Sequence, residues 1–167
     1  RENRRFLAAL QEDLHWGGQL QRALLRLDLP SSRGASYSLT SIPLPEFQCG
    51  GDYHDVVTLG ADQTMFMVGD VEGHGVKAAF MTFFLRAAIR QGYLVAAEEP
   101  SPAGLLTWLN RLICSELGSL PSLLISLAVC KLRDSPPLLS YASAGHPPIY
   151  RVRDQGATAL RERGMGL

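Results

Sequence analysis

The chain has 167 residues, of which 46% are apolar and 19% are charged, which predicts one packed domain and excludes an intrinsically disordered chain. The 16 Lys and Arg residues balance the 16 Asp and Glu residues, so no net field attracts nucleic acid or an anionic membrane. No apolar run approaches the roughly 18 residues of a membrane-spanning helix, and we expect no signal peptide. The three separated cysteines form no metal-binding pattern, so we expect a cytoplasmic protein with reduced thiols.

Residues 1–28 are predicted to form one helix. Its apolar residues recur at a spacing of three or four and would pack on a partner or on the domain body; they are Phe6, Leu10, Leu20, Leu24 and Leu27. The pair Gly17-Gly18 predicts an interruption or hinge, because each glycine costs about 1 kcal/mol relative to alanine in a helix interior. The pattern fits a segment that arrives from an upstream domain, and it fits a simple N-terminal packing helix equally well.

The remaining chain alternates between short strands and two helices. Strands are predicted where β-prone stretches are bounded by turn residues; they are Tyr37–Ile42, Tyr53–Leu59, Thr64–Val68, Leu123–Lys131, Leu138–Ala142 and Ile149–Arg153. Apolar residues on one face predict helices over Val76–Tyr93 and from Ser101-Pro102 to about Leu117. Because the strands are short and adjacent, they favour antiparallel sheets with the two helices layered on them.

Two aspartates that follow glycines, Asp52 and Asp70, lie on either side of the turn at Gly60–Gln63. With this turn centred on Ala61, Asp52 faces Asp70 across the hairpin, where opposed Cβ atoms lie about 4.5–5.5 Å apart. Two carboxylates this close repel unless one is protonated or a cation lies between them. Hard divalent cations prefer such oxygens, so the pair predicts a Mg²⁺ or Mn²⁺ site. The alternative is two ordinary Gly-Asp turns.

Other polar residues near this pair are predicted to have supporting roles. His54 is expected to pack on its strand, with contact to the substrate as the alternative. His74 is expected to hold a turn by hydrogen bonding, with metal binding as the alternative, and His146 is expected to shape a tight turn between two strands. Asp55 and Glu72 are expected behind the ligands or in solvent, because the backbone beside the second aspartate can supply an oxygen directly. Both faces of the hairpin carry apolar residues, which predicts cover on both sides by a second sheet and by helices.

Three motifs stand in a fixed order along the chain. They are Gly50-Gly51-Asp52-Tyr53-His54-Asp55-Val56, Gly69-Asp70-Val71-Glu72-Gly73-His74-Gly75-Val76-Lys77-Ala78-Ala79 and Ala142-Ser143-Ala144-Gly145-His146-Pro147-Pro148. In this order they resemble the SpoIIE/RsbU-type bacterial PPM phosphatases. The resemblance implies an α/β (α+β) fold of two antiparallel β-sheets sandwiched between helices, preceded by an N-terminal linker helix. It implies a regulatory or linker helix over residues 1–30 and a PPM-type phosphatase domain, without its C-terminal part, over residues 31–167.

The resemblance also implies which residues bind metal. Asp52 matches the first metal-binding aspartate, and Asp70 matches the aspartate that bridges two ions; these are the expected catalytic residues. Val71 matches the neighbour that binds metal through its backbone carbonyl. Family members continue past a segment like Gly166-Leu167 into a Thr-Asp-Gly motif and a final aspartate, which supply further ligands, whereas this sequence stops before both.

The implied function is a metal-dependent protein serine/threonine phosphatase with two Mn²⁺ or Mg²⁺ ions. Its substrate would be a phosphorylated regulatory protein, such as an anti-sigma-factor antagonist, in bacterial signalling. Expected partners are this phosphoserine or phosphothreonine protein, an upstream sensor or receiver domain, and a second copy bound through the N-terminal helix. The alternative is a catalytically inactive phosphatase-like module used for dimerisation or partner binding. A nucleotide-binding loop is not expected, because no Gly-x-x-x-x-Gly-Lys or Gly-x-Gly-x-x-Gly pattern occurs.

Overall fold

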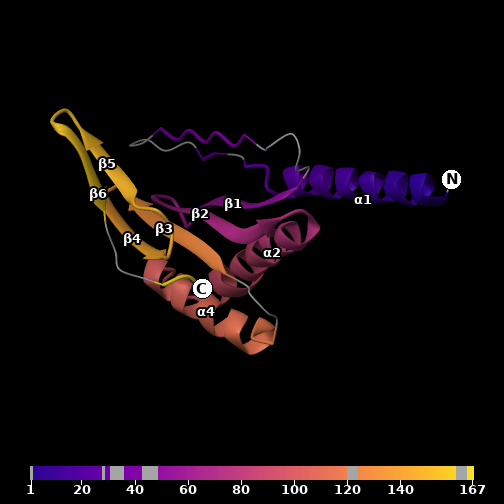
Figure 1. Cartoon of the computed structure of the whole chain (residues 1–167). Coiled ribbons are helices and arrows are strands. Elements are labelled where there is room, and N and C mark those ends of the chain that lie inside the picture. Colours follow the sequence, from indigo (N-terminus) through magenta and orange to yellow (C-terminus); the bar gives the residue numbers. More distant parts are fainter. Residues whose placement is uncertain (1, 28, 31–35, 43–48, 120–123, 161–164) are drawn as a thin grey trace.

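The computed structural model describes residues 2–27, 29–30, 36–42, 49–119, 124–160 and 165–167. Helices and strands make up most of this part of the chain (Figure 1). In chain order they are α1 (Glu2–Leu24), β1 (Gly50–Thr58), β2 (Gln63–His74), α2 (Val76–Ala87), the π-helix η1 (Ala88–Tyr93), α3 (Leu94–Ala96), α4 (Pro102–Leu117), β3 (Ile125–Arg133), β4 (Leu138–Ala144), β5 (Ile149–Arg153) and β6 (Gly156–Leu160).

The strands form two antiparallel sheets, as predicted. One has four strands in the order β1-β2-β3-β4, and the other is the hairpin of β5 and β6. β1 begins at Gly50 and β2 ends at His74, so both strands are longer than the sequence pattern predicted. Asp52 and Asp70 therefore lie inside paired strands and not in turns beyond them.

Helices α2 and α4 cover one face of the four-stranded sheet (Figure 1). Alternate side chains of β1 and β2 are buried against them, as the two-residue period of a strand requires. These side chains are Tyr53, Met65, Met67 and Val71, and they belong to one core with Leu85, Ile89, Leu105 and Leu109. Burial of each large apolar side chain stabilises the fold by about 1.5–3 kcal/mol, so this layer fixes the sheet on its helices.

The opposite face of the sheet carries Asp52, Asp70 and Val68. Among the described residues this face, called the open face below, is covered only in part: Val56 is 9% exposed there, whereas Val68 is 47% exposed. The predicted cover is therefore present on the helix side and partial on the open face. Residues 36–42 pass over the open face without forming a strand, which corrects the strand predicted over Tyr37–Ile42. This segment packs through side chains, with the ring centroids of Tyr37 and Phe66 at 4.9 Å.

Helix α1 runs without a break through Gly17 and Gly18, so the predicted interruption is wrong. The helix ends at Leu24, before the predicted end at residue 28. Its C-terminal part is held on the domain body by buried Gln21, and the turn that follows is held by Leu25. Its N-terminal part projects away from the body (Figure 1). Packing at one end favours the helical state along the whole segment, because propagation costs less than nucleation.

The two central helices begin where the sequence predicts. α2 begins at Val76, but the last part of the predicted helix up to Tyr93 is the π-helix η1. α4 begins at Pro102, and the Ser101 hydroxyl accepts a hydrogen bond from the Gly104 N–H at 3.2 Å, as expected for an N-cap.

Candidate metal centre

The two aspartates of the sequence prediction lie opposite each other. Asp52 of β1 pairs with Asp70 of β2 in the antiparallel register. The register shifts between Gly50 and Asp52, so an irregularity in the hairpin begins directly beside the pair. Such bulges redirect side chains and are common next to active sites. Both carboxylates lie on the open face of the sheet and are exposed to solvent.

A backbone carbonyl lies close to the Asp70 carboxylate at this irregularity. A Cβ atom at position 51 would collide with the Val71 carbonyl oxygen and would lie 3.1 Å from Oδ1 of Asp70. Gly51 therefore allows a carbonyl oxygen and a carboxylate oxygen to converge where any other residue would place its side chain. Val71 contributes only its backbone here, since its side chain is buried on the helix side of the sheet.

The electrostatics of the pair favour a bound proton or cation. Partial burial raises the pKa of Asp70 above its ordinary value of 3.8, and the charge of Asp52 raises it further. His146 opposes this shift. A divalent cation would remove the repulsion by binding both carboxylates.

His146 lies close enough to this pair to interact with Asp70. Its Nδ1 is 2.9 Å from the Ser126 hydroxyl, and Ser126 is the partner of Asp70 in the pairing of β2 with β3. Gly145 has a φ of 64°, which confirms the predicted tight turn before His146. The sequence analysis missed the proximity to Asp70. Sequence reasoning could not place it there, because the position of His146 depends on the β2–β3 register.

The other predicted supporting residues have different positions. Asp55 is buried on the helix side, where it pairs with Arg86 and Arg90 of the covering helices. Glu72 is exposed, and its N–H donates to the Leu124 carbonyl at 2.9 Å. His54 is half-buried on the open face.

A cleft of about 560 Å³ lies over the aspartate pair. Its floor includes Asp52, Asp70 and His54 of the sheet. Its opposite wall consists of the end of α1 and residues 25–27, 29, 39, 41 and 42. The candidate centre therefore opens into a cleft whose volume lies within the range of ligand-binding sites, roughly 300–1,000 Å³.

The sequence profile of the family "Stage II sporulation protein E (SpoIIE)" matches residues 60–167, which is more than half of the chain. The chain belongs to the SpoIIE family. The resemblance stated from the motifs is thereby confirmed, and the second and third motifs lie inside the matched range.

Solved structures with similar folds agree with the SpoIIE assignment. The SiaA-PP2C domain of Pseudomonas aeruginosa matches with a TM-score of 0.70 at 19% identity, over 99% of this chain and 65% of that chain. The structure of the RsbU and RsbW domains of Rv1364c from Mycobacterium tuberculosis matches with a TM-score of 0.59 at 30% identity, over 74% of this chain and 33% of that chain. The SpoIIE-family chain thus has a PP2C-like fold and spans 65% and 33% of these two relatives.

The donors of this SpoIIE-family chain fit an oxygen-preferring cation in part. Asp52, Asp70 and the Val71 carbonyl offer the hard oxygens that Mg²⁺ and Mn²⁺ prefer. Within the described ranges, no three His, Cys, Asp or Glu side chains lie close enough to hold a metal ion. The three donors therefore supply one side of a coordination sphere. No helix in the same ranges is both long and apolar enough to cross a membrane.

Proposed function

We propose that this chain is the catalytic domain of a metal-dependent protein serine/threonine phosphatase that acts on a phosphorylated regulatory protein. The observation that carries the proposal is the opposition of Asp52 and Asp70, with the Val71 carbonyl and the Asp70 carboxylate converging at Gly51. Membership of the SpoIIE family supports the same function. An anti-sigma-factor antagonist in bacterial signalling is the proposed type of substrate.

The proposed ligand roles follow from this geometry. Asp52 would bind one Mn²⁺ or Mg²⁺ ion, Asp70 would bridge two, and Val71 would contribute its carbonyl oxygen. When bound, the ions would supply an activated water and Lewis acidity at the phosphoryl oxygens. The two carboxylates would hold the ions on the β1–β2 hairpin, and the cleft above them would leave room for a phosphoryl group.

Leu167 lies near the proposed metal ligands in the sheet. Its N–H donates to the Ile125 carbonyl at 2.8 Å, and Ile125 pairs with Val71 on the other side of β3. Leu167 is therefore two strand positions away from the candidate centre.

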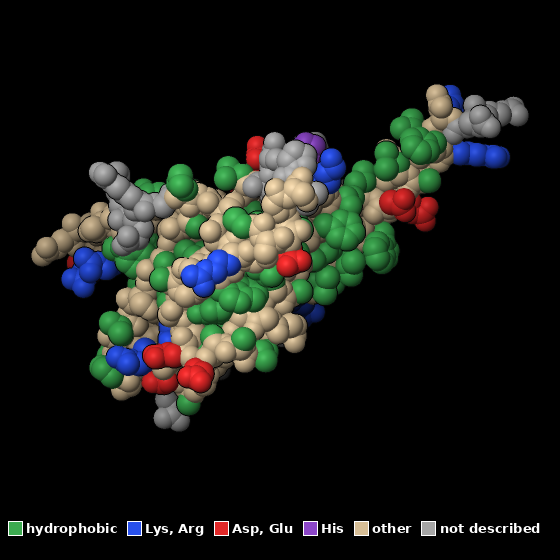
Figure 2. Space-filling view, turned by 90° about the horizontal axis from the view of Figure 1, so that it is seen from below, with side chains coloured by type: hydrophobic (Ala, Val, Ile, Leu, Met, Phe, Trp, Pro, Cys, Tyr) green, Lys and Arg blue, Asp and Glu red, His purple; other side chains and the backbone are tan. Residues whose placement is uncertain are grey.

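The proposed organisation is a regulatory or linker helix over residues 1–30 and a phosphatase domain over residues 31–167. Apolar side chains gather along the projecting part of α1 (Figure 2); those of Phe6, Leu7 and Leu10 are exposed. They would pair with a second copy or pack against an upstream sensor or receiver domain. Phe6→Asp with Leu10→Asp should abolish such a dimer in sedimentation of the full-length protein, with Glu2→Gln as control.

The test of the function is hydrolysis of a phosphoserine protein by the full-length protein. Turnover should require Mn²⁺ or Mg²⁺ and stop in excess chelator, and Asp52→Asn should lower it by about 100-fold or more, since electrostatic stabilisation by a charged group contributes on this scale. Undiminished turnover in chelator would refute the metal role. Binding of the phosphoprotein without any turnover would support the alternative, a catalytically inactive phosphatase-like module.

A further inference from the structure

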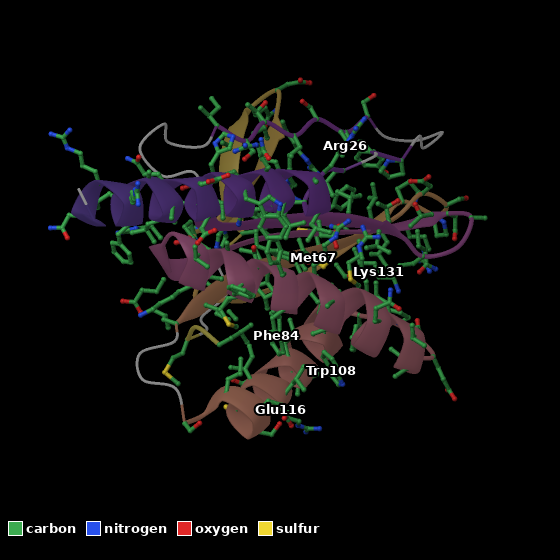
Figure 3. The ribbon with its side chains drawn as sticks, turned by 90° about the vertical axis from the view of Figure 1, so that its right-hand side faces the viewer. Arg26, Met67, Phe84, Trp108, Glu116 and Lys131 are labelled. Carbon is green, nitrogen blue, oxygen red and sulfur yellow. The ribbon has the colours of Figure 1, made fainter. Side chains whose placement is uncertain are left out.

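Two arginines lie on the wall of the cleft that faces the aspartate pair. Arg22 lies in the last turn of α1, and Arg26 lies two residues after the helix ends at Leu24. Both line the same cleft as Asp52 and Asp70. Figure 3 shows Arg26 on the opposite side of the sheet from the helices that carry Phe84 and Trp108, which is the side of the open face.

The residues directly before Arg22 and Arg26 fix the position of this segment on the domain body. Gln21 precedes Arg22, and its Nε2 donates to the Gly50 carbonyl at 2.7 Å and to the Thr82 hydroxyl at 3.0 Å. Its Oε1 accepts from the Gly50 N–H at 3.0 Å. Leu25 precedes Arg26 and is 6% exposed in the core. The residue before each arginine is therefore buried. Through Gln21, this part of the wall is hydrogen-bonded to Gly50, the first residue of β1.

The charge on this wall is available to a ligand. Both arginines are exposed. Among the described residues, the ion pairs within 4.0 Å are those of Asp55 with Arg86 and Arg90, so neither Arg22 nor Arg26 is neutralised there by a carboxylate. Guanidinium groups bind phosphate and carboxylate in two-point fashion, which makes such a pair an anion-binding surface.

The same cleft has an apolar side. Leu29, Leu39 and Ile42 line it beside the arginines, and Ile42 is 83% exposed. A free inorganic anion would use the arginines and leave these side chains in water. A protein segment would cover both, because the side chains that flank its anionic group can bury against the leucines and the isoleucine.

We propose that Arg22 and Arg26 form the recognition wall for a phosphorylated protein segment, with its anionic group between the arginines and the aspartate pair and its apolar flanking residues on Leu29, Leu39 and Ile42. This inference rests on the proposed function, since it names how the same site selects its substrate. The arginines attract the phosphoryl group toward a floor that carries two negative charges of its own. They act in binding and orientation and not in the bond-breaking step.

The test compares two double variants of the full-length protein. Arg22→Gln with Arg26→Gln removes the wall, and Arg4→Gln with Arg5→Gln removes two exposed arginines from the projecting end of the same helix. The probe is a fluorescent phosphoserine peptide with leucines beside the phosphoserine, and its Kd is measured by anisotropy in Mn²⁺ at several salt concentrations. The wall variant should raise the Kd by about 10-fold or more and flatten its salt dependence, and the control should change neither.

Three further measurements decide between explanations. The unphosphorylated peptide should bind the wild-type protein more weakly and respond little to the wall variant. Arg22→Lys with Arg26→Lys keeps the charge and should recover part of the affinity, which excludes a folding defect. If the wall variant changes the Mn²⁺ affinity measured by thermal shift but leaves peptide binding unchanged, the arginines only balance the aspartate pair and the proposal is overturned. Equal losses in wall and control variants would also overturn it.

Failure of the proposed function would give a different result. A wild-type protein that binds the phosphopeptide but never hydrolyses it would contradict the phosphatase assignment. The effect of Arg22 and Arg26 on binding would still be measured in that protein, and it would support or overturn the recognition wall on its own.

Discussion

Arg90 holds Asp55 by two hydrogen bonds, from Nε to Oδ2 at 2.8 Å and from Nη2 to Oδ1 at 2.6 Å. Arg86 adds a third at 2.9 Å, and the Val56 N–H donates to the same carboxylate at 2.9 Å. Asp55 is 1% exposed. This cluster fastens the covering helices to β1 three residues after Asp52, so it holds the candidate centre in place from behind.

Replacing Asp55 with alanine should therefore destabilise the fold strongly. The change leaves two arginines beside a buried site without their carboxylate, and removal of one partner from a buried ion pair costs about 3–5 kcal/mol. The part exposure of Arg86 and Arg90 favours the lower end of that range. The measurement is the free energy of unfolding in urea. Glu99→Ala, at an exposed position, is the control and should change it by less than about 0.5 kcal/mol. A loss at Asp55 no larger than the control's would contradict the structural role.

Asp70→Asn should stabilise the metal-free protein at neutral pH or leave its stability unchanged. The folded-state pKa of Asp70 is raised above 3.8, so ionisation of this carboxyl costs the folded state stability. That loss develops as the pH rises from 3.8 through the folded-state pKa, and asparagine removes it. Melting temperatures between pH 3 and pH 8 without metal should show the difference growing with pH.

The same variant should lose the metal response. Added Mn²⁺ should raise the melting temperature of the wild-type protein and of Glu72→Gln, whose side chain is exposed beside the site. Asp70→Asn should lack this rise. If it keeps the wild-type rise, Asp70 does not bind the ion.

The contrast between Asp70 and Asp55 shows what the sequence could predict. The pairing of Asp52 with Asp70 follows from the centre of one turn and the strand period, both of which are local, and the structure confirms it. The strand period places Asp55 on the opposite face from Asp52, but its role depends on which helix packs on that face. Only long-range packing places Arg86 and Arg90 there.

The errors in the prediction have the same origin. The break predicted at Gly17-Gly18 was inferred from helix propensity, and docking of the helix end through Gln21 outweighs that propensity. The position of His146 depends on the register between β2 and β3, which no turn residue specifies because α2, η1, α3 and α4 separate these strands along the chain. In the sequence, Arg22 and Arg26 are ordinary polar residues near the end of a predicted helix. Only the fold brings them to the same cleft as the two aspartates.

His146 should titrate below its ordinary pKa of 6.5, because burial disfavours its charged form, and the charge of Asp70 should offset part of this shift. Asp70→Asn removes the offset, so the pKa of His146 should fall further in that variant. Glu72→Gln is the control for a lost surface charge. The measurement is an NMR titration of the imidazole without metal. A rise of the His146 pKa in Asp70→Asn would contradict the proximity of the two groups.

The same shift predicts how stability depends on pH. Since the folded-state pKa of His146 lies below the unfolded value, its contribution is complete above pH 6.5 and is lost as the pH falls through the folded-state pKa. His146→Gln, which cannot be protonated, should therefore flatten this part of the stability curve. An unchanged curve would mean that His146 is not buried as described.

Two adjacent glycines offer the sharpest test of the candidate centre. At Gly51 an added Cβ would collide with the Val71 carbonyl and approach Oδ1 of Asp70 at 3.1 Å, while at Gly50 it would meet no heavy atom within 4 Å. Gly51→Ala should therefore displace the carbonyl or the carboxylate and destabilise the fold by about 1–3 kcal/mol, as overpacking does. It should also reduce the rise of melting temperature in Mn²⁺, because two of the three proposed oxygen ligands lie at this contact. Gly50→Ala should keep both the stability and the metal response. If the two variants behave alike, the convergence of Val71 and Asp70 at Gly51 does not form the cation site.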